Sequence, residues 1–239
     1  MRRFYDDQSF NIAQPAGLSE HTSHHISRVL RMQPGDEIVL FNGQGGEWQA
    51  RIDSIDKRHV HVVPLQHQPD DRTPSCKVHL ALPLIKGDRM DYALQKATEL
   101  GAASFQLLAT ERTDVRLDGS RTEKRLQHWQ QVVISACEQC GLNRIPALHA
   151  PIALSGYLQQ ERDGNCLIAH PGEAAIGITT LQQAASIHLL TGPEGGFSLV
   201  EIELARAQGF QPFALGQRVL RAETAPAALL AAIWMARGG

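Results

Sequence analysis

The chain has 239 residues, and its 43% hydrophobic and 20% charged residues are ordinary for a globular protein with a buried core. This length allows one large domain or two small ones. The formal net charge is −2, and the charges balance in both parts of the chain: residues 1–72 hold 8 Arg and Lys against 10 Asp and Glu, and residues 73–239 hold 15 against 15. The overall charge therefore does not attract nucleic acid, and any RNA would have to bind through local basic patches.

The sequence carries no recognisable export signal or membrane span. Residues 1–7 end in two aspartates rather than in an apolar stretch. The longest mostly apolar run, 225–236, is too short to cross a bilayer and predicts a buried helix. We therefore expect a cytoplasmic protein without membrane contact, in which the cysteines are reduced.

Four cysteines occur, at Cys76, Cys137, Cys140 and Cys166. Cys137 and Cys140 form a C-x-x-C pair, but a structural zinc site would need a second pair of ligands with suitable spacing, which is absent. The pair also lies near the end of a helical pattern rather than at a helix start, where a redox pair would stand. No metal is predicted, and two thiols packed in a helix are the favoured interpretation.

Residues 1–68 predict a β-rich domain. Short β-branched runs separated by glycine turns predict strands at 36–41, 48–55 and 59–65, and a helix is predicted at 21–31. The following polar segment, 66–75, contains Pro69 and Pro74 and is typical of a linker. We place the linker at 69–75 and a second domain at 76–239.

The second domain alternates strands and helices, which is typical of a largely parallel α/β sheet. The predicted strands are 77–82, 105–109, 166–169, 187–190 and 213–215. The predicted helices are 88–100, 122–139, 198–208 and 223–237.

The most informative stretch is 187–198, in which a buried strand runs through Gly192-Pro193-Glu194-Gly195-Gly196 into a helix. Ser198 and Glu201 have the spacing of a capping box. Ligands of open α/β sheets bind in loops at the carboxyl ends of strands, and glycines there allow close approach. The loop lacks the P-loop and dinucleotide patterns, and its Glu194 would repel a polyphosphate. It therefore suits a cationic ligand such as the sulfonium of S-adenosylmethionine (SAM), although by itself the segment could be only a tight turn.

Two further loops have the same form. One runs from Leu215 through Gly216 to a helix for which Thr224 can act as N-cap and Pro226 suits the first turn. The other follows the strand at 166–169 and contains His170-Pro171-Gly172. Three such loops in one domain make a ligand pocket plausible.

The combination of GPEGGFS with LGQRVLRAETA resembles the SPOUT superfamily of knotted methyltransferases. More specifically, it is similar to the bacterial enzymes that methylate N3 of a uridine in small-subunit (16S) ribosomal RNA. Further matching segments lie at 24–31, 35–36, 40–43, 86–91, 95–101, 110–113 and 138–139. The resemblance extends over nearly the whole chain, and the order of the motifs makes it specific.

The resemblance implies an α/β fold with a small N-terminal PUA-like β-barrel that binds RNA and a C-terminal trefoil-knotted methyltransferase domain. It further implies a homodimer and a SAM site among the three loops. The general rule against knots has exceptions, and this superfamily is one. Two departures from the family pattern are Ala222, where Thr is more common, and Pro226; the first puts a hydroxyl contact at position 222 in doubt.

Candidate site residues follow from the resemblance, which implies the cofactor loops, and from the charge and chemistry of the residues beside them. The candidate cofactor residues are His170, Pro171, Gly172, Leu190, Thr191, Gly192, Gly195, Gly196, Leu215, Gly216, Val219, Leu220 and Thr224. Arg221 is the candidate cation that stabilises the negative charge forming on the carbonyl oxygens of the uracil. Glu223 and Glu194 are weaker candidates for the general base that removes the N3 proton, or for groups that orient the substrate. An ion pair between Arg221 and Glu223 that merely orders the loop is the alternative. The RNA-contact candidates are Arg2, Arg3, Arg28, Arg31, Arg112 and Arg116, and an ordinary surface charge is the alternative for each.

Three other functions stay open from the residues. The first is a methyltransferase of this superfamily that acts on another RNA. The second is a noncatalytic RNA-binding factor in ribosome assembly. The third is a dehydrogenase-like nucleotide enzyme, which the missing phosphate-binding pattern disfavours.

Overall fold

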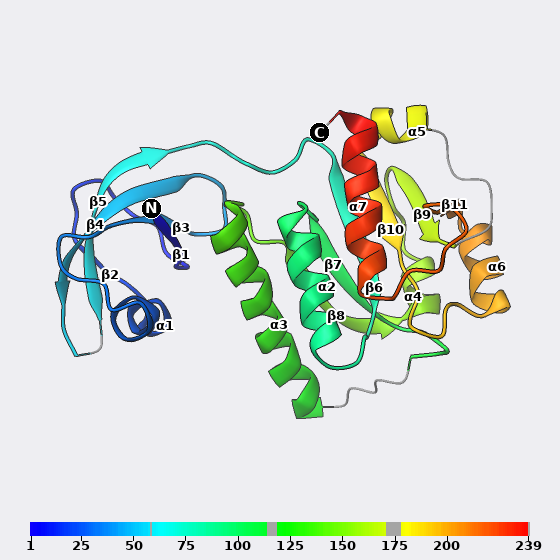
Figure 1. Cartoon of the computed structure of the whole chain (residues 1–239), viewed down its shortest axis with the longest axis horizontal. Coiled ribbons are helices and arrows are strands. Elements are labelled where there is room, and N and C mark those ends of the chain that lie inside the picture. Colours follow the sequence, from blue (N-terminus) through cyan, green and yellow to red (C-terminus); the bar gives the residue numbers. More distant parts are fainter. Residues whose placement is uncertain (58, 114–118, 171–177, 239) are drawn as a thin grey trace. The chain divides into compact units, whose positions relative to one another are not determined.

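The chain was analysed as a computed structural model, which describes residues 1–57, 59–113, 119–170 and 178–238. It divides into two compact units (Figure 1). The first comprises Met1–Thr73 and Ile134–Ile145, and the second comprises Pro74–Val133 and Pro146–Gly239. The change from the first unit to the second falls within the predicted linker. The sequence did not predict that 134–145 would belong with the N-terminal unit.

The first unit is built on a five-stranded sheet of order β1-β3-β4-β5-β2. Its strands are β1 (Arg2–Tyr5), β2 (Ala16–Gly17), β3 (Glu37–Phe41), β4 (Glu47–Ile55) and β5 (Val60–Gln68). β1 pairs with β3 in parallel, and the other neighbours are antiparallel. Helix α1 (Glu20–His24), capped by the Ser19 hydroxyl, continues into a short π-helix (His25–Val29). The three predicted strands and the helix are confirmed, whereas β1 and β2 were missed.

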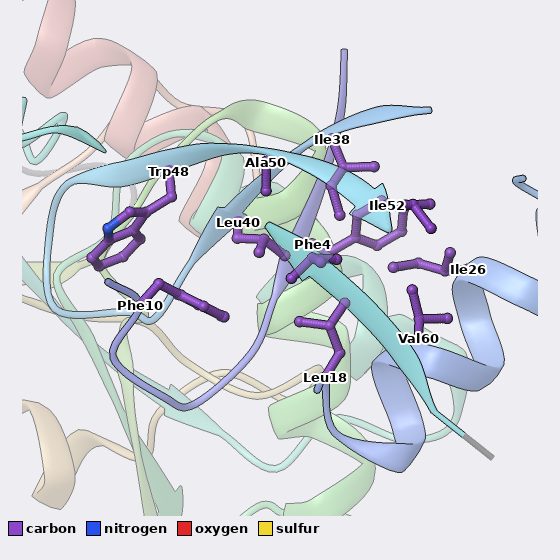
Figure 2. Packing of buried hydrophobic residues seen from close by; sticks show 11 residues of the cluster. Phe4, Phe10, Leu18, Ile26, Ile38, Leu40, Trp48, Ala50, Ile52 and Val60 are labelled. Carbon is purple, nitrogen blue, oxygen red and sulfur yellow. The ribbon is translucent and has the colours of Figure 1, made fainter. Parts of the chain in front are cut away.

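The core of this unit lies between the sheet and the helical segment (Figure 2). Ile26 of the π-helix points toward Ile52 and Val60 of the strands, and all three are fully buried. At the other end of the cluster, Trp48 and Phe10 meet edge to face, with ring centroids 5.4 Å apart. The alternation of buried and exposed residues along β4 is what directs one face of the strand into this core.

A charge cluster around the buried Glu47, at the start of β4, connects Arg3 near the start of the chain with Arg72 in the segment after β5. The Glu47 carboxylate is 7% exposed and pairs with Arg3, whose side chain is 11% exposed, and with Arg72 at 2.9 Å. Arg3 also donates to the Leu142 carbonyl and lies over the Phe41 ring. Removing one partner of a buried pair leaves an uncompensated charge, so the cluster constrains the unit strongly.

We expect Glu47→Gln to lower the free energy of unfolding of the first unit by about 3 kcal/mol, because it leaves the Arg3 guanidinium buried without its carboxylate. The measurement is urea unfolding followed by circular dichroism. Glu37→Gln is the matched control, because Glu37 is an exposed glutamate on the neighbouring strand. Equal unfolding midpoints for the two variants would contradict the assignment.

The predicted linker is anchored to the first unit. The Arg72 N–H donates to Asn143 Oδ1 at 3.2 Å, and the Arg144 guanidinium donates to Asp71. Asn143, which is fully buried, also donates to the Asp70 carbonyl. Asn143 and Arg144 therefore hydrogen-bond to the segment that its composition predicts to be a linker.

The second unit contains a six-stranded sheet of order β11-β9-β10-β6-β7-β8, in which all pairings are parallel. Its strands are β6 (Lys77–Pro83), β7 (Ser104–Ala109), β8 (Ala147–Ala153), β9 (Asn165–Ala169), β10 (Ser186–Leu190) and β11 (Gln211–Phe213). Its helices are α2 (Asp88–Glu99), α4 (Leu154–Leu158), α5 (Ile178–Gln183), α6 (Leu199–Ala207) and α7 (Thr224–Arg237). Helix α3 (Gly119–Cys140) begins in this unit and ends in the first. The α/β prediction is confirmed, although β8, α4 and α5 were missed and β11 lies two residues earlier than predicted.

Both faces of this sheet are apolar. On one face, Ala81, Ile168 and Leu190 pack with helices α4 and α6. Their neighbours along the strands, such as Leu82 and Leu189, are also buried and face the opposite side. Helices α2 and α7 pack against each other and lie over the sheet in Figure 1. Burial on both faces is usual for parallel sheets and leaves the ends of the strands for function.

Among the helices that the structure describes, none is long and apolar enough to cross a membrane.

Candidate functional site

A cavity lies at the edge of the second unit's sheet where β9, β10 and β11 end. Because these strands are parallel, their carboxyl ends meet at the same edge. The end of β9 with His170, the loops after β10 and β11, and the start of α7 line a cavity of about 350 Å³. Its lining comprises Ala169, His170, Gly192, Pro193, Glu194, Gly195, Gly196, Phe197, Phe213, Ala214, Leu215, Arg218, Val219, Leu220, Ala222, Ala225 and Leu229. Residues from the predicted loops after β10 and β11 therefore line one cavity, and His170 is the one residue of the predicted loop after β9 that the structure describes there.

The glycine loop after β10 is fixed at both ends. The Thr191 N–H donates to the Ala81 carbonyl, and the Gly196 N–H donates to the Pro193 carbonyl at 2.8 Å, which closes a turn. Ser198 then caps α6 in a complete capping box with Glu201, as the sequence predicts. A short, tightly closed loop of this kind presents its backbone to a ligand.

At two of the loop's positions a larger residue would press against a neighbouring side chain. A Cβ at Gly192 would lie 3.1 Å from the Phe197 ring, which itself lines the cavity. A Cβ at Gly195 would lie 3.3 Å from the Cβ of Arg112. Glycine at these positions therefore lets the loop pack closely on both neighbours.

The loop before α7 holds the second set of candidates. The Arg221 carbonyl accepts hydrogen bonds from the Thr224 and Ala225 N–H groups, so the backbone is fixed while the Arg221 side chain is exposed. Ala222 is buried and lines the cavity, and its methyl side chain offers a ligand no hydroxyl. The prediction that Thr224 caps α7 is wrong by one residue: Glu223 is the N-cap and makes no side-chain cap bond, because the turn uses the Arg221 carbonyl instead.

The two candidate carboxylates differ in their partners. Glu194 lines the cavity and pairs with Arg89 at 3.6 Å. Glu223 Oε2 is buried and has no hydrogen-bond partner among the described residues, and no ion pair joins Glu223 to Arg221 there. The ion-pair alternative for Arg221 therefore loses its support.

The cavity gathers some of the predicted cofactor residues and not others. The residues that line it are His170, Gly192, Gly195, Gly196, Leu215, Val219 and Leu220. Leu190, Thr191, Gly216 and Thr224 do not line it, although the last three each adjoin a lining residue in the chain, and Pro171 and Gly172 lie outside the described residues. Sequence reasoning did not list Phe197, Phe213 or Leu229, whose apolar character made them look like ordinary core.

The RNA-contact candidates differ in their surroundings. Arg2, Arg28 and Arg31 are exposed on the first unit. Arg3 is committed to the buried Glu47 cluster, which argues against its prediction as an RNA contact. Arg112 is exposed but donates to the glycine loop, at 2.9 Å from the Gly195 carbonyl, and Arg116 lies outside the described residues.

No group of three or more His, Cys, Asp or Glu side chains that could hold a metal occurs within residues 1–57, 59–113, 119–170 and 178–238. Cys137 is buried in α3, and burial raises the pKa of its thiol, which makes it unreactive.

A stacked histidine pair lies on the sheet that carries the cavity. His79 of β6 and His188 of β10 are register partners, with ring centroids 4.8 Å apart. His79 Nδ1 lies 2.7 Å from the Ser104 hydroxyl, and His188 Nε2 lies 3.0 Å from the Asp163 carbonyl oxygen. Burial, followed by the neighbouring His79, lowers the pKa of His188 to about 4, and burial also lowers the pKa of His79.

These depressed pKa values predict a loss of stability in mild acid. The unfolded chain binds a proton at His188 below about pH 6.5, whereas the folded chain binds it only near pH 4. The free energy of unfolding should therefore fall as pH drops through 6.5, by about 2 kcal/mol at pH 5 from His188 alone. Urea unfolding at pH 7 and pH 5 tests this, with His188→Gln expected to lose at least half of the difference. An unchanged difference in that variant would assign the acid sensitivity elsewhere.

Comparison with known proteins places these features in a family. The family described as an RNA methyltransferase domain matches residues 72–234, which is well over half of the chain, and an RNA methyltransferase PUA domain matches residues 18–65. The first unit's sheet is thus PUA-like and the second unit is the methyltransferase domain, as the resemblance implied.

Individual relatives agree with these matches. The ribosomal RNA small subunit methyltransferase E of Synechocystis is 36% identical over 88% of this chain and 69% of its own length, and that of Bacillus subtilis is 30% identical over 98% and 96%. The crystal structure of the enzyme with the same name from Neisseria gonorrhoeae, bound to SAM, superposes with a TM-score of 0.91 at 35% identity, covering 98% of this chain and 97% of that one. The chain belongs to the RNA methyltransferase family that includes the ribosomal RNA small subunit methyltransferases E.

Proposed function

We propose that this protein transfers a methyl group from SAM to 16S ribosomal RNA of the small ribosomal subunit, at N3 of a uridine. The observation that carries the proposal is the cavity at the ends of β9, β10 and β11, because it is formed by the loops that the resemblance assigns to SAM. The named relatives act on ribosomal RNA of the small subunit, and one of them is solved with SAM. The choice of N3 rests on the resemblance of the motifs alone.

The residues present fit SAM. A volume of about 350 Å³ falls within the range of small-molecule sites. The walls are mostly apolar, and the two charged lining residues, Glu194 and Arg218, balance each other, so no excess of cations favours a polyphosphate. The buried Thr191 hydroxyl, directly before lining residue Gly192, has no partner among the described residues and could bond to a ligand. The cofactor residues that we propose are the predicted residues that line the cavity, together with the lining residue Arg218 and with Thr191, which precedes lining residue Gly192.

When bound, SAM supplies the methyl group. The chain's own residues must position the base and manage the proton on uracil N3, which makes that nitrogen a poor nucleophile until the proton leaves. Arg221 is the proposed cation that stabilises negative charge on the flanking carbonyl oxygens. Glu223 is a better candidate for the base than Glu194, because one of its oxygens is unpartnered whereas Glu194 is paired with Arg89.

RNA would reach this site through local cations rather than through the field of the whole chain, whose net charge is −2. Arg2, Arg28 and Arg31 are the proposed contacts on the PUA-like unit, because all three are exposed. If one of these arginines contacts a phosphate, reversing its charge should weaken RNA binding and should lower the slope of log affinity against log salt concentration by about one. We expect the protein to act in the cytoplasm, where ribosomes are assembled.

A homodimer with a knotted second unit is part of the same proposal. Val219 and Leu215 line the cavity yet are 82% and 39% exposed, so the cavity has an apolar rim that a second protomer could cover. Light scattering after gel filtration measures the oligomeric state, and a monomer at micromolar concentration would contradict the dimer.

The decisive experiment supplies tritiated SAM to the protein with isolated small subunits, naked 16S RNA and transfer RNA in parallel, and then maps the modified base. Label on N3 of a single 16S uridine is the expected result. Label on transfer RNA would redirect the proposal to another RNA. SAM binding without transfer to any of the three would favour a noncatalytic assembly factor.

A further inference from the structure

The segment after β7 is tied to the glycine loop, although the two lie more than 80 residues apart in sequence. The segment, 110–113, forms its own turn: the Thr113 N–H donates to the Thr110 carbonyl, and the two threonine hydroxyls lie 2.7 Å apart. This turn places Glu111 and Arg112 next to the segment from Gly195 to Glu201, and both make hydrogen bonds to it.

The first tie passes through Glu201. Its carboxylate accepts from the Glu111 N–H at 2.8 Å with one oxygen and from the Ser198 N–H at 2.9 Å with the other. Glu201 is only 8% exposed, so both oxygens are used in a partly desolvated place where such bonds are strong. The carboxylate that caps α6 therefore also anchors the segment after β7.

The second tie is Arg112. Its Nη1 donates to the Gly195 carbonyl at 2.9 Å and to the Phe197 carbonyl at 3.5 Å. Both of these residues line the cavity. The glycine loop has few side chains with which to hold itself, and glycine loses more freedom on ordering than any other residue. Donors from outside the loop therefore decide how well it is ordered before a ligand arrives.

We propose that Arg112 is a positioning residue for the cofactor site: it holds the Gly195 and Phe197 carbonyls and so preorganises the wall of the cavity. This inference rests on the proposed function, because it names SAM as the ligand of that wall. It gives Arg112 a role within the protein instead of the contact with RNA that its charge had indicated.

The test measures SAM affinity by calorimetry in the absence of RNA. Arg112→Ala should weaken SAM binding about tenfold, because a charge-assisted hydrogen bond is lost from each of two carbonyls. Arg112→Lys should restore part of the loss, since an ammonium can still donate to one carbonyl. Arg125→Ala is the matched control, because Arg125 is an exposed arginine on α3. The thermal midpoints of all variants should stay close to that of the wild type, because Arg112 is exposed.

The sign of the effect separates positioning from charge. SAM carries a positive sulfonium, so removing a nearby cation would tighten its binding if electrostatics alone mattered. S-adenosylhomocysteine lacks that sulfonium and should lose affinity by the same factor as SAM if Arg112 acts through the loop. Unchanged SAM affinity in Arg112→Ala, with weaker RNA binding and a smaller salt slope, would overturn the inference in favour of an RNA contact. Failure of the wild type itself to bind SAM would instead refute the proposed function.

Discussion

Gly192→Ala is expected to weaken SAM binding about tenfold. The new Cβ would lie 3.1 and 3.2 Å from two carbons of the Phe197 ring, closer than side chains normally approach. Because Phe197 lines the cavity and is buried, the ring must shift into the space proposed for the cofactor or push the loop away from it. Overpacking of this kind typically costs 1 to 3 kcal/mol, about 5- to 150-fold in affinity. Gly192→Val should approach the upper end.

Calorimetric titration with SAM gives the measurement, and Gly156→Ala is its control. Gly156 lies in α4 of the same unit, has nothing within 4 Å of its Cβ position and does not line the cavity. Its substitution should leave SAM affinity unchanged and stabilise the helix slightly. If both alanines bind SAM like the wild type, the close packing of Gly192 on Phe197 does not shape the cofactor site.

The parts of the fold that the sequence predicted are those with local causes. The spacing of Ser198 and Glu201 predicts a capping box, and the structure contains it. Strands β6 and β10 are short, mostly apolar runs, and this composition predicts strands that are buried on both faces of the sheet. The glycine loop could be predicted as a ligand loop because strand, turn and helix signals follow one another within 12 residues.

The parts that were missed depend on contacts between distant segments. β1 carries two arginines and pairs with β3 some 36 residues away, so it has no local pattern to predict it. β8 is an edge strand that contains Pro151 and has mostly exposed or half-buried residues. The end of α3 belongs to the first unit because Glu138 accepts the Tyr5 N–H at 2.9 Å, a bond that no helical periodicity reveals.

Charge alone also does not distinguish the candidate arginines from one another. Arg3 and Arg112 are predicted as RNA contacts together with Arg2 and Arg28 because each carries a positive charge. The structure separates them: Arg3 neutralises the buried Glu47, and Arg112 donates to the glycine loop. A sequence gives the number of cations, whereas their partners depend on the tertiary fold.

Arg221→Ala is expected to lower the turnover number by about 100- to 1,000-fold, the effect of removing one group that stabilises developing charge. The affinity for SAM should change less than about twofold, because the Arg221 side chain is exposed and does not line the cavity. The substitution should leave the loop intact, since it is the Arg221 carbonyl that accepts from Thr224 and Ala225.

Single-turnover transfer of tritium from SAM to small subunits separates this chemical effect from binding. Arg221→Lys keeps the charge but loses the planar fork, so it should recover only part of the rate. Glu223→Gln supplies the matching test of the base: if Glu223 removes the uracil proton, the loss in that variant should shrink as pH rises and the N3 proton leaves unaided. Turnover near that of the wild type in Arg221→Ala would end the catalytic assignment. The cavity would then remain a cofactor site whose charge-stabilising group lies elsewhere, with the lining Arg218 as the next arginine to replace.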